Sequence, residues 1–341
     1  MHPRNKQLTV GAFAGKRNPA ASRWPGKVAW LIVAGVAGAA GFGLLRDAAA
    51  VSFEDTVWTK YDNTIHDLSD TTSTNGRIPL GTNGKGDDGG VLFPRMVAGV
   101  TNQMWYGGND GANYRIYYAT SPDGLTWTKY DNTVPGVSDT TSTGGRISLG
   151  TAGTGDDLYV YAPCVLKDGA TYKMWYTGHD GTNYRIYYAT SPDGLTWTKY
   201  DNTVPSPSDT ISTNGRIPLG TAGTGDDSLV LGPSVLKDGA TYRMWYAGSD
   251  NTTQRIYYAT SPDGLTWTKY NNALPTNSNT TSTDGRIPTG TAGKGDIGHA
   301  TTPFVIRDSN TYKMWYGGSS NVWSIYHANR YPPPGTFISA W

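Results

Sequence analysis

Glutamate is almost absent from this 341-residue chain, which has a single Glu, Glu54, among its 27 acidic residues. Leu and Lys are also few, so the residues that favour helices are scarce. The chain instead holds 44 Gly, 23 Tyr and 12 Trp, a composition typical of short strands joined by tight turns. These proportions exclude a helical bundle and argue against a doubly wound α/β domain.

Cysteine is nearly absent too, because Cys164 is the only one. A single cysteine excludes an intrachain disulfide and a metal cluster built on several thiolates. The net charge of +1 conceals an asymmetry, since residues 1–50 carry +6 and residues 51–341 carry −5. A weakly acidic body argues against nucleic acid as the main partner.

The N-terminal segment has the pattern of an export signal. Residues 1–27 hold six basic residues and no acidic one, residues 28–45 are uncharged, and an Ala-Ala-Ala motif ends at Ala50. This pattern predicts a secretory signal peptide in residues 1–50 that is cleaved after Ala50. Two alternatives remain: an uncleaved membrane anchor through residues 28–45, and a pilin-like leader cut after Gly26. Each places the body outside the cytoplasm, in an extracellular or cell-surface location, with membrane contact only through residues 28–45 if these are retained.

The body, residues 51–341, repeats one unit four times with a period close to 70 residues. The motif M-W-Y begins at Met104, Met174, Met244 and Met314, and the string R-I-Y-Y-A-T-S-P-D-G-L-T-W-T-K-Y begins at Arg115, Arg185 and Arg255. The repeats span about 63–132, 133–202, 203–272 and 273–341.

Each repeat predicts four short antiparallel strands. In the second repeat these are residues 158–169, 171–178, 184–191 and 195–202, with Asp-Gly turns after the first and third. Four such strands with aromatic residues at fixed positions form the blade of a β-propeller. We expect the aromatic residues of the M-W-Y and L-T-W motifs to pack between blades, because one blade cannot bury both of its faces.

The two ends of the body complement each other. Residues 57–63, V-W-T-K-Y-D-N, match the fourth strand of a repeat with no blade before it, whereas the last repeat stops after its third strand. The sequence therefore predicts an all-β, four-bladed propeller in which residues 57–63 complete the last blade and close the ring. A five-bladed glycosidase-like propeller and a linear solenoid are the alternatives.

Strand alternation places the loops before each first strand and the turns after each second strand on one face of the propeller. Charged residues beside aromatic strands on that face suit a hydroxyl-rich ligand such as a carbohydrate. The alternative is structural: Asp as a turn cap and Arg as a strut to a neighbouring Asp. Asp pairs could also hold Ca²⁺, and no other cofactor is expected. The candidate ligand-binding residues are Asp87, Asp88, Asp156, Asp157, Asp226, Asp227, Asp296, Arg77, Arg146, Arg216, Arg286, Asp110, Asp180 and Asp250.

The string P-x-V-L-K-D-G-A-T-Y-(K/R)-M-W-Y, followed by Y-Y-A-T-S-P-D-G-L-T-W-T-K, resembles the blades of the glycoside hydrolase propellers. That superfamily includes the family 43 arabinanases, levansucrases, invertases and mannoside phosphorylase relatives. The resemblance implies five blades, a Glu as general acid, and an Asp before the Pro of a first inner strand as general base. This chain has Phe93, Ala162, Gly232 and Thr302 at the Asp positions, and its only Glu precedes the first blade. S-P-D-G-L-T-W also resembles the Asp-box turn of sialidases.

These observations predict an exported, non-catalytic propeller that binds a glycan or another cell-surface polymer, or that serves as a structural surface unit. No catalytic residue and no metal ligand is assigned, because glycoside hydrolysis ordinarily needs two carboxyl groups in different environments. The alternative is a glycoside hydrolase, or a related carbohydrate-active enzyme, that uses Asp residues of the candidate face on an extracellular polysaccharide.

Overall fold

The computed structural model describes Ser73, 76–134, 140–204, Ser212, 214–270, Ala273, Ser282 and 285–330. The chain divides into two compact units, Met1–Trp58 and Thr59–Trp341, and every described residue belongs to the second. The predicted export signal, residues 1–50, and the predicted closing strand, residues 57–63, lie outside the described residues. In the part of the chain that is described, no helix is long and apolar enough to cross a membrane.

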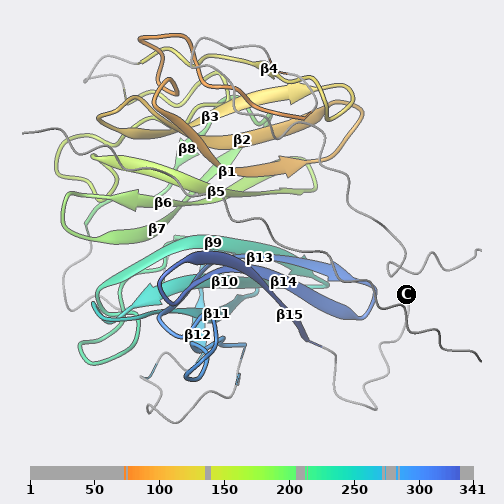
Figure 1. Ribbon diagram of the computed structural model, residues 1–341. Coiled ribbons are helices and arrows are strands. Elements are labelled where there is room, and N and C mark those ends of the chain that lie inside the picture. Colours follow the sequence, from red (N-terminus) through yellow and green to blue (C-terminus); the bar gives the residue numbers. More distant parts are fainter. Residues whose placement is uncertain are drawn as a thin grey trace, which may run out of the picture. The chain divides into compact units, whose positions relative to one another are not determined.

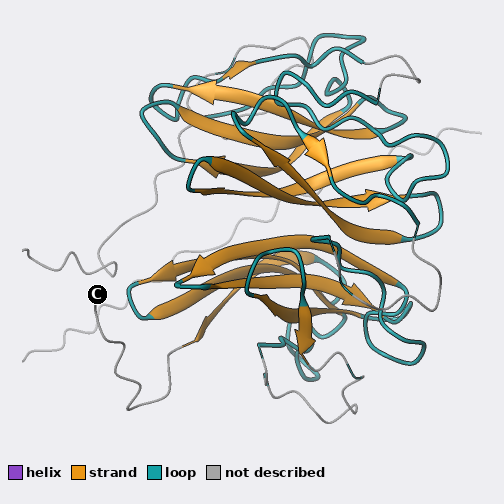
Figure 2. Cartoon of the chain, turned by 180° about the vertical axis from the view of Figure 1, so that it is seen from behind, coloured by secondary structure: helices purple, strands orange, loops and turns teal. Residues whose placement is uncertain are grey.

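The described residues form strands and loops, with no helix among them (Figure 2). The strands fall into four consecutive antiparallel groups, which we call blades 1 to 4 (Figure 1). Blade 1 holds β1 (Gly90–Val97), β2 (Asn102–Asn109), β3 (Tyr114–Ser121) and β4 (Thr128–Lys129), and blade 2 holds β5 (Tyr159–Asp168), β6 (Thr171–His179), β7 (Tyr184–Ser191) and β8 (Thr198–Lys199). Blade 3 holds β9 (Leu229–Asp238), β10 (Thr241–Ser249), β11 (Gln254–Ser261) and β12 (Thr268–Tyr270), and blade 4 holds β13 (His299–Asp308), β14 (Thr311–Ser319) and β15 (Trp323–Arg330).

The structure confirms the prediction that the chain is all-β and that each repeat forms antiparallel strands. Blades 1 and 2 also share a single parallel bridge between Tyr114 and Tyr159, so their strands form one hydrogen-bonded sheet. No sheet closes on itself among the described residues. The number of blades in a ring, and its closure, therefore stay predictions.

The fourth strands of blades 1 to 3 are shorter than predicted. In blade 2 it is β8, two residues long, rather than residues 195–202. The reason is the turn before it, where Asp193 Oδ1 accepts the backbone N–H groups of Leu195 and Thr196, each at 2.8 Å. Trp197 Nε1 donates to the carbonyl of Gly194 at 3.0 Å, so the turn continues up to the tryptophan and the strand begins only after it.

Aromatic residues fill the interfaces between consecutive blades, as predicted. Between blades 1 and 2, Trp105 and Ile116 of blade 1 pack with Met174 and Trp197 of blade 2 in one fully buried cluster. Ile147, from the loop that joins the two blades, lies in the same cluster. Its backbone exchanges hydrogen bonds of 3.0 and 3.4 Å with that of Ile116. The loop is therefore part of the interface rather than a surface excursion.

In blade 4, no neighbouring blade or loop among the described residues covers the third strand, β15, in this way. Ile325 of β15 is 80% exposed, whereas the equivalent Ile116, Ile186 and Ile256 of the other blades are fully buried. Trp323, two residues earlier on the same strand, is 59% exposed. Among the described residues, one face of blade 4 thus has no neighbour of the kind that covers blades 1 to 3.

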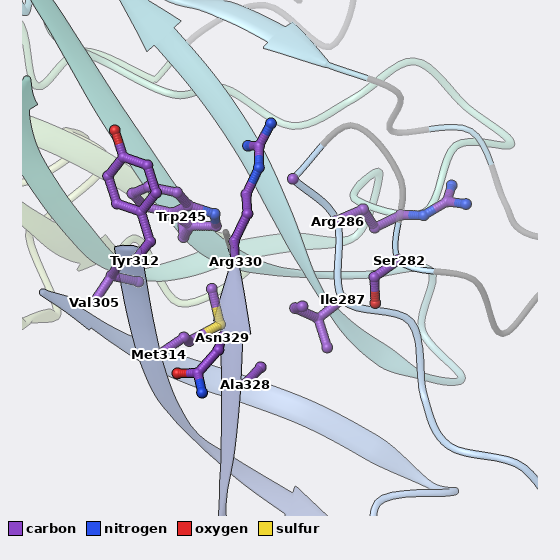
Figure 3. A pocket seen from close by; sticks show the side chains of 11 residues that line it. Trp245, Ser282, Arg286, Ile287, Val305, Tyr312, Met314, Ala328, Asn329 and Arg330 are labelled. Carbon is purple, nitrogen blue, oxygen red and sulfur yellow. The ribbon is translucent and has the colours of Figure 1, made fainter. Parts of the chain in front are cut away.

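A cavity of about 240 Å³ lies between blades 3 and 4 (Figure 3). At the two preceding interfaces the same place holds an indole. Trp197 meets Trp105 with ring centroids 5.9 Å apart, and Trp267 meets Trp175 at 5.8 Å, both edge to face. Trp245, the third member of this series, lines the cavity instead. The full lining is Trp245, Ser282, Gly285, Arg286, Ile287, Val305, Tyr312, Met314, Ala328, Asn329 and Arg330.

Candidate functional site

The first strands of the four blades, β1, β5, β9 and β13, are called the inner strands here. They line a second cavity of about 280 Å³, which we call the four-strand cavity. It is formed by equivalent positions of the four repeats. Its lining residues are Phe93, Pro94, Arg95, Ala162, Pro163, Gly232, Pro233, Thr302, Pro303 and Phe304. Two aromatic rings and four prolines make most of this surface apolar, and its only ionisable group is the guanidinium of Arg95.

A β-bulge creates the lining in every blade. The register between inner and second strands shifts at this point, and the residue before each proline has a positive φ. These residues are Phe93 at 52°, Ala162 at 48°, Gly232 at 61° and Thr302 at 46°. The proline that follows has no N–H to give to the ladder, so it suits the bulge. Left-handed backbone at non-glycine residues, above all at the β-branched Thr302, is strained.

The same four residues occupy the positions at which the resemblance implies a general-base Asp. The structure therefore brings the implied catalytic positions of all four repeats to one cavity, and none of them carries a carboxyl group. The sequence identifies these four positions but assigns them no role.

The side chain of Arg95 contacts the equivalent residue of each of the other three blades, which is the residue after the proline. Its Nη2 donates to Cys164 Sγ at 3.1 Å and to Ser234 Oγ at 3.2 Å, and its guanidinium carbon lies 4.8 Å from the ring centroid of Phe304. Cys164 and Ser234 are almost fully buried. Sequence reasoning missed Arg95, although a signal was present: the residue after the proline differs in all four repeats, and only in the first is it charged.

Three of the candidate Asp residues are the centres of buried polar networks. Asp156, which is fully buried, accepts hydrogen bonds from Tyr176 at 2.8 Å, Lys199 at 2.7 Å and Asn202 at 2.7 Å. Asp87 has the equivalent partners Tyr106, Lys129 and Asn132, and Asp226 accepts from Tyr246 and Lys269. Asp296 accepts from Tyr316 at 2.8 Å.

These networks join the fourth strand of a blade to the loop that precedes its first strand. Burial lowers the pKa of Lys199, while the carboxylate of Asp156 opposes that shift. Burial, together with the Asp156 charge, raises the pKa of Tyr176 well above its ordinary value. The lysine, tyrosine and carboxylate thus hold one another in place within the blade. These contacts are of the kind expected if the Asp residues have a structural role.

The second Asp of each pair caps a turn. Asp157 accepts the backbone N–H of Gly153 at 2.7 Å, and Asp88 and Asp227 accept those of Gly84 and Gly223 at 2.6 and 2.7 Å. The fourth repeat has Ile297 at this position, and that side chain is 40% exposed.

The Asp residues after the second strands pair with an arginine of the third. Asp180 binds Arg185 at 2.7 Å, Asp110 binds Arg115 at 2.6 Å and Asp250 binds Arg255 at 2.9 Å. Burial raises the pKa of Asp180, but hydrogen bonds from the backbone amides of Asn183 and Thr182, and then from Arg185, outweigh burial and leave the pKa below its usual value.

The loop arginines are likewise held by the protein. Arg146 pairs with Asp131 and Arg216 with Asp201, both at 3.1 Å, and Arg286 Nη1 donates to the carbonyl of Ala273 at 3.2 Å. Ser73 donates to the carbonyl of Arg77 at 2.7 Å. Within the described residues, no group of three or more His, Cys, Asp or Glu side chains could hold a metal ion. Calcium stays a prediction.

Comparison with known proteins gives partial matches. No protein-family profile matches the chain. Two Mycobacterium tuberculosis proteins, uncharacterized proteins MT1551 and Rv1502, are each 37% identical over 119 residues, which is 33% of this chain. The match spans 34% of the length of each of these curated relatives.

Solved structures of glycosidases are similar at low identity. A glycosyl hydrolase from Bacteroides ovatus is 17% identical, with 69% of this chain and 65% of that chain covered and a TM-score of 0.46. A thermostable family-43 glycoside hydrolase is 15% identical, with 77% and 73% covered and a TM-score of 0.46. A Bombyx mori GH32 β-fructofuranosidase is 13% identical, with 71% and 46% covered and a TM-score of 0.45. Likenesses of this size carry no conclusion about this chain.

We expect Asp156→Ala to destabilise the protein by about 3–5 kcal/mol, because it leaves the buried Lys199 without its counter-ion. Asp157→Ala is the matched control, since Asp157 only caps a turn and its loss should cost at most about 1 kcal/mol. Urea unfolding followed by tryptophan fluorescence measures both. Equal stability of the two variants would contradict the network's structural role.

We also expect stability to fall on acidification below about pH 4. The pKa of Asp180 in the folded protein lies below its unfolded value of about 3.9, so its carboxylate stabilises the fold above that value and loses its effect as pH falls through the folded pKa. Asp180→Asn keeps the turn hydrogen bonds but cannot titrate. Urea midpoints measured at pH 6 and pH 2.5 should therefore differ less for this variant than for the wild type, and an identical difference would refute the assignment.

Proposed function

We propose that this protein is an exported, non-catalytic carbohydrate-binding protein and that the four-strand cavity is its binding site. The single observation that carries the proposal is the lining of that cavity, which has no Asp and no Glu. Hydrolysis of a glycosidic bond by the common mechanisms needs two carboxyl groups about 5–10 Å apart. A cavity at the implied catalytic positions without either group supports binding without turnover.

The lining has the groups that sugar recognition uses. Phe93 and Phe304 are 36% and 43% exposed, so their faces can pack against the C–H face of a pyranose or furanose ring. The guanidinium of Arg95 provides hydrogen-bond donors beside them. The cavity volume of about 280 Å³ suits one saccharide residue of a longer chain rather than a large ligand.

Export rests on the sequence of residues 1–50, which gives the protein an extracellular or cell-surface location and a polysaccharide of that environment as its ligand. The alternative, a glycoside hydrolase, requires reactive carboxyl groups in the candidate face. The networks around Asp87, Asp156 and Asp226 argue against it, because their carboxylates already bind lysine and tyrosine of the same blade.

We expect the protein to bind at least one polysaccharide of an arabinan, xylan, fructan, mannan and galacturonan panel without releasing reducing sugar. Phe304→Ala should weaken binding about fivefold to tenfold through loss of a stacking surface. Ile306→Ala is the control, because it removes a similarly exposed side chain of the same strand outside the cavity. Affinity electrophoresis and a reducing-end assay measure the two properties. Steady sugar release that Asp156→Asn abolishes would favour the hydrolase instead.

We further propose that the body is a four-bladed propeller, in which residues 57–63 form the fourth strand of blade 4. Trp58, Lys60 and Asn63 match Trp127, Lys129 and Asn132 of blade 1 in the repeat alignment. The cavity between blades 3 and 4 supports this proposal, because it lies where Trp197 and Trp267 fill the two preceding interfaces. Asp296 adds support, since its equivalents bind the lysine and asparagine that Lys60 and Asn63 would supply.

Trp58→Ala should cost about 3–5 kcal/mol of stability, as expected for loss of a buried tryptophan, and so should Trp267→Ala at the filled interface. Val57→Ala is the control, because the equivalent Thr126 is exposed. Urea unfolding of the three variants measures the effect. A Trp58→Ala protein as stable as the wild type, next to a destabilised Trp267→Ala protein, would rule out this strand as the closure.

A further inference from the structure

Arg95 has no counter-ion among the described residues, unlike the arginines of the third strands. Arg115, Arg185 and Arg255 each bind an Asp carboxylate at 2.6–2.9 Å. Among the described residues, no carboxylate lies within ion-pair distance of Arg95. The protein groups that contact its guanidinium are a thiol, a hydroxyl and an aromatic ring, from Cys164, Ser234 and Phe304.

The guanidinium also keeps donors for a ligand. It has five N–H groups, and the hydrogen bonds to Cys164 and Ser234 both come from Nη2. Nε and Nη1 have no hydrogen-bond partner among the described residues. Because Arg95 lines the four-strand cavity, a molecule in the cavity can reach the charge from a surface that is otherwise apolar. A half-buried charge in such surroundings is poorly hydrated, so pairing with an anion is favoured more than at an exposed site.

Arg95 is also the only charged residue at its position in the four repeats. The equivalents of Arg95 in the other three repeats are Cys164, Ser234 and Phe304, which are uncharged side chains that surround the guanidinium. The repeats are therefore not equivalent at this point, although the third strands of blades 1 to 3 are nearly identical. One specialised position within a repeated scaffold points to one ligand site rather than to four.

We propose that the four-strand cavity binds an acidic saccharide, with the carboxylate of a uronic acid residue paired to the guanidinium of Arg95 and its ring packed on Phe304 and Phe93. A planar carboxylate matches two N–H donors of a guanidinium in a bidentate arrangement. The strained backbone at Phe93, Ala162 and Thr302 agrees with a site where side chains are held in place for a ligand. This inference rests on the proposed function and names the class of glycan.

The experiment compares trigalacturonate, its methyl ester and galactotriose by isothermal titration calorimetry with the full mature chain. We expect trigalacturonate to bind, and to bind at least about tenfold more weakly when its carboxylates are esterified or replaced by the neutral sugar, because a hydrogen bond to a charged group is lost. Binding of all three with equal affinity would overturn the role of the carboxylate while leaving the proposed function intact. Failure of these and of every polysaccharide in the panel would overturn the proposed function itself.

Variants test the residue. Arg95→Gln should weaken trigalacturonate binding about tenfold to a hundredfold, and Arg95→Lys should retain part of the affinity and its dependence on salt. Arg307→Gln, on β13 but outside the cavity, removes the same charge and should bind as the wild type does. Thermal melting checks that each variant folds. Unchanged binding by folded Arg95→Gln, or a sulfated trisaccharide bound in place of the uronate, would refute the assignment.

Discussion

The packing of each blade on the next is the constraint on which the rest of this structure depends. A four-stranded antiparallel blade has two apolar faces and can bury neither alone. Trp105 of blade 1 and Trp175 of blade 2 each receive the indole of the following blade, and Ile147 and Ile217 of the joining loops complete the same clusters. A substitution in one repeat therefore alters the packing of the neighbouring repeats. This dependence explains why the aromatic motifs recur with so little variation.

The polar residues of the repeats support this packing. The network of Asp156, Tyr176 and Lys199 fastens a very short fourth strand that two ladder pairs with β7 could not hold by themselves. Asp193 fixes the turn before that strand. These side chains have the same structural partners from repeat to repeat, whereas Arg95 stands at a position where the four repeats differ.

Several features follow from local sequence and were therefore predictable. The strands in blade 2, the turns at Asp168-Gly169 and Asp193-Gly194, and the aromatic interfaces follow from alternation, turn chemistry and the period of the repeat. The candidate Asp and Arg residues were chosen from the same patterns. Their surroundings were not predictable, because the partners of Asp156 lie up to 46 residues away in the sequence. Hydrogen bonds over that separation depend on how the strand and the loop are brought together.

The sequence by itself determined the fold class and the repeated blade, because a period-2 alternation and Asp-Gly turns act within a few residues of one another. It also determined that the residues before the four prolines carry no carboxyl group. Only the tertiary structure decided that Phe93, Ala162, Gly232 and Thr302 line one cavity, and that Arg95 meets Cys164, Ser234 and Phe304 there. The residues that different repeats contribute are 69 or more positions apart, so no local rule relates them. They meet because packing of the blades brings the four first strands together.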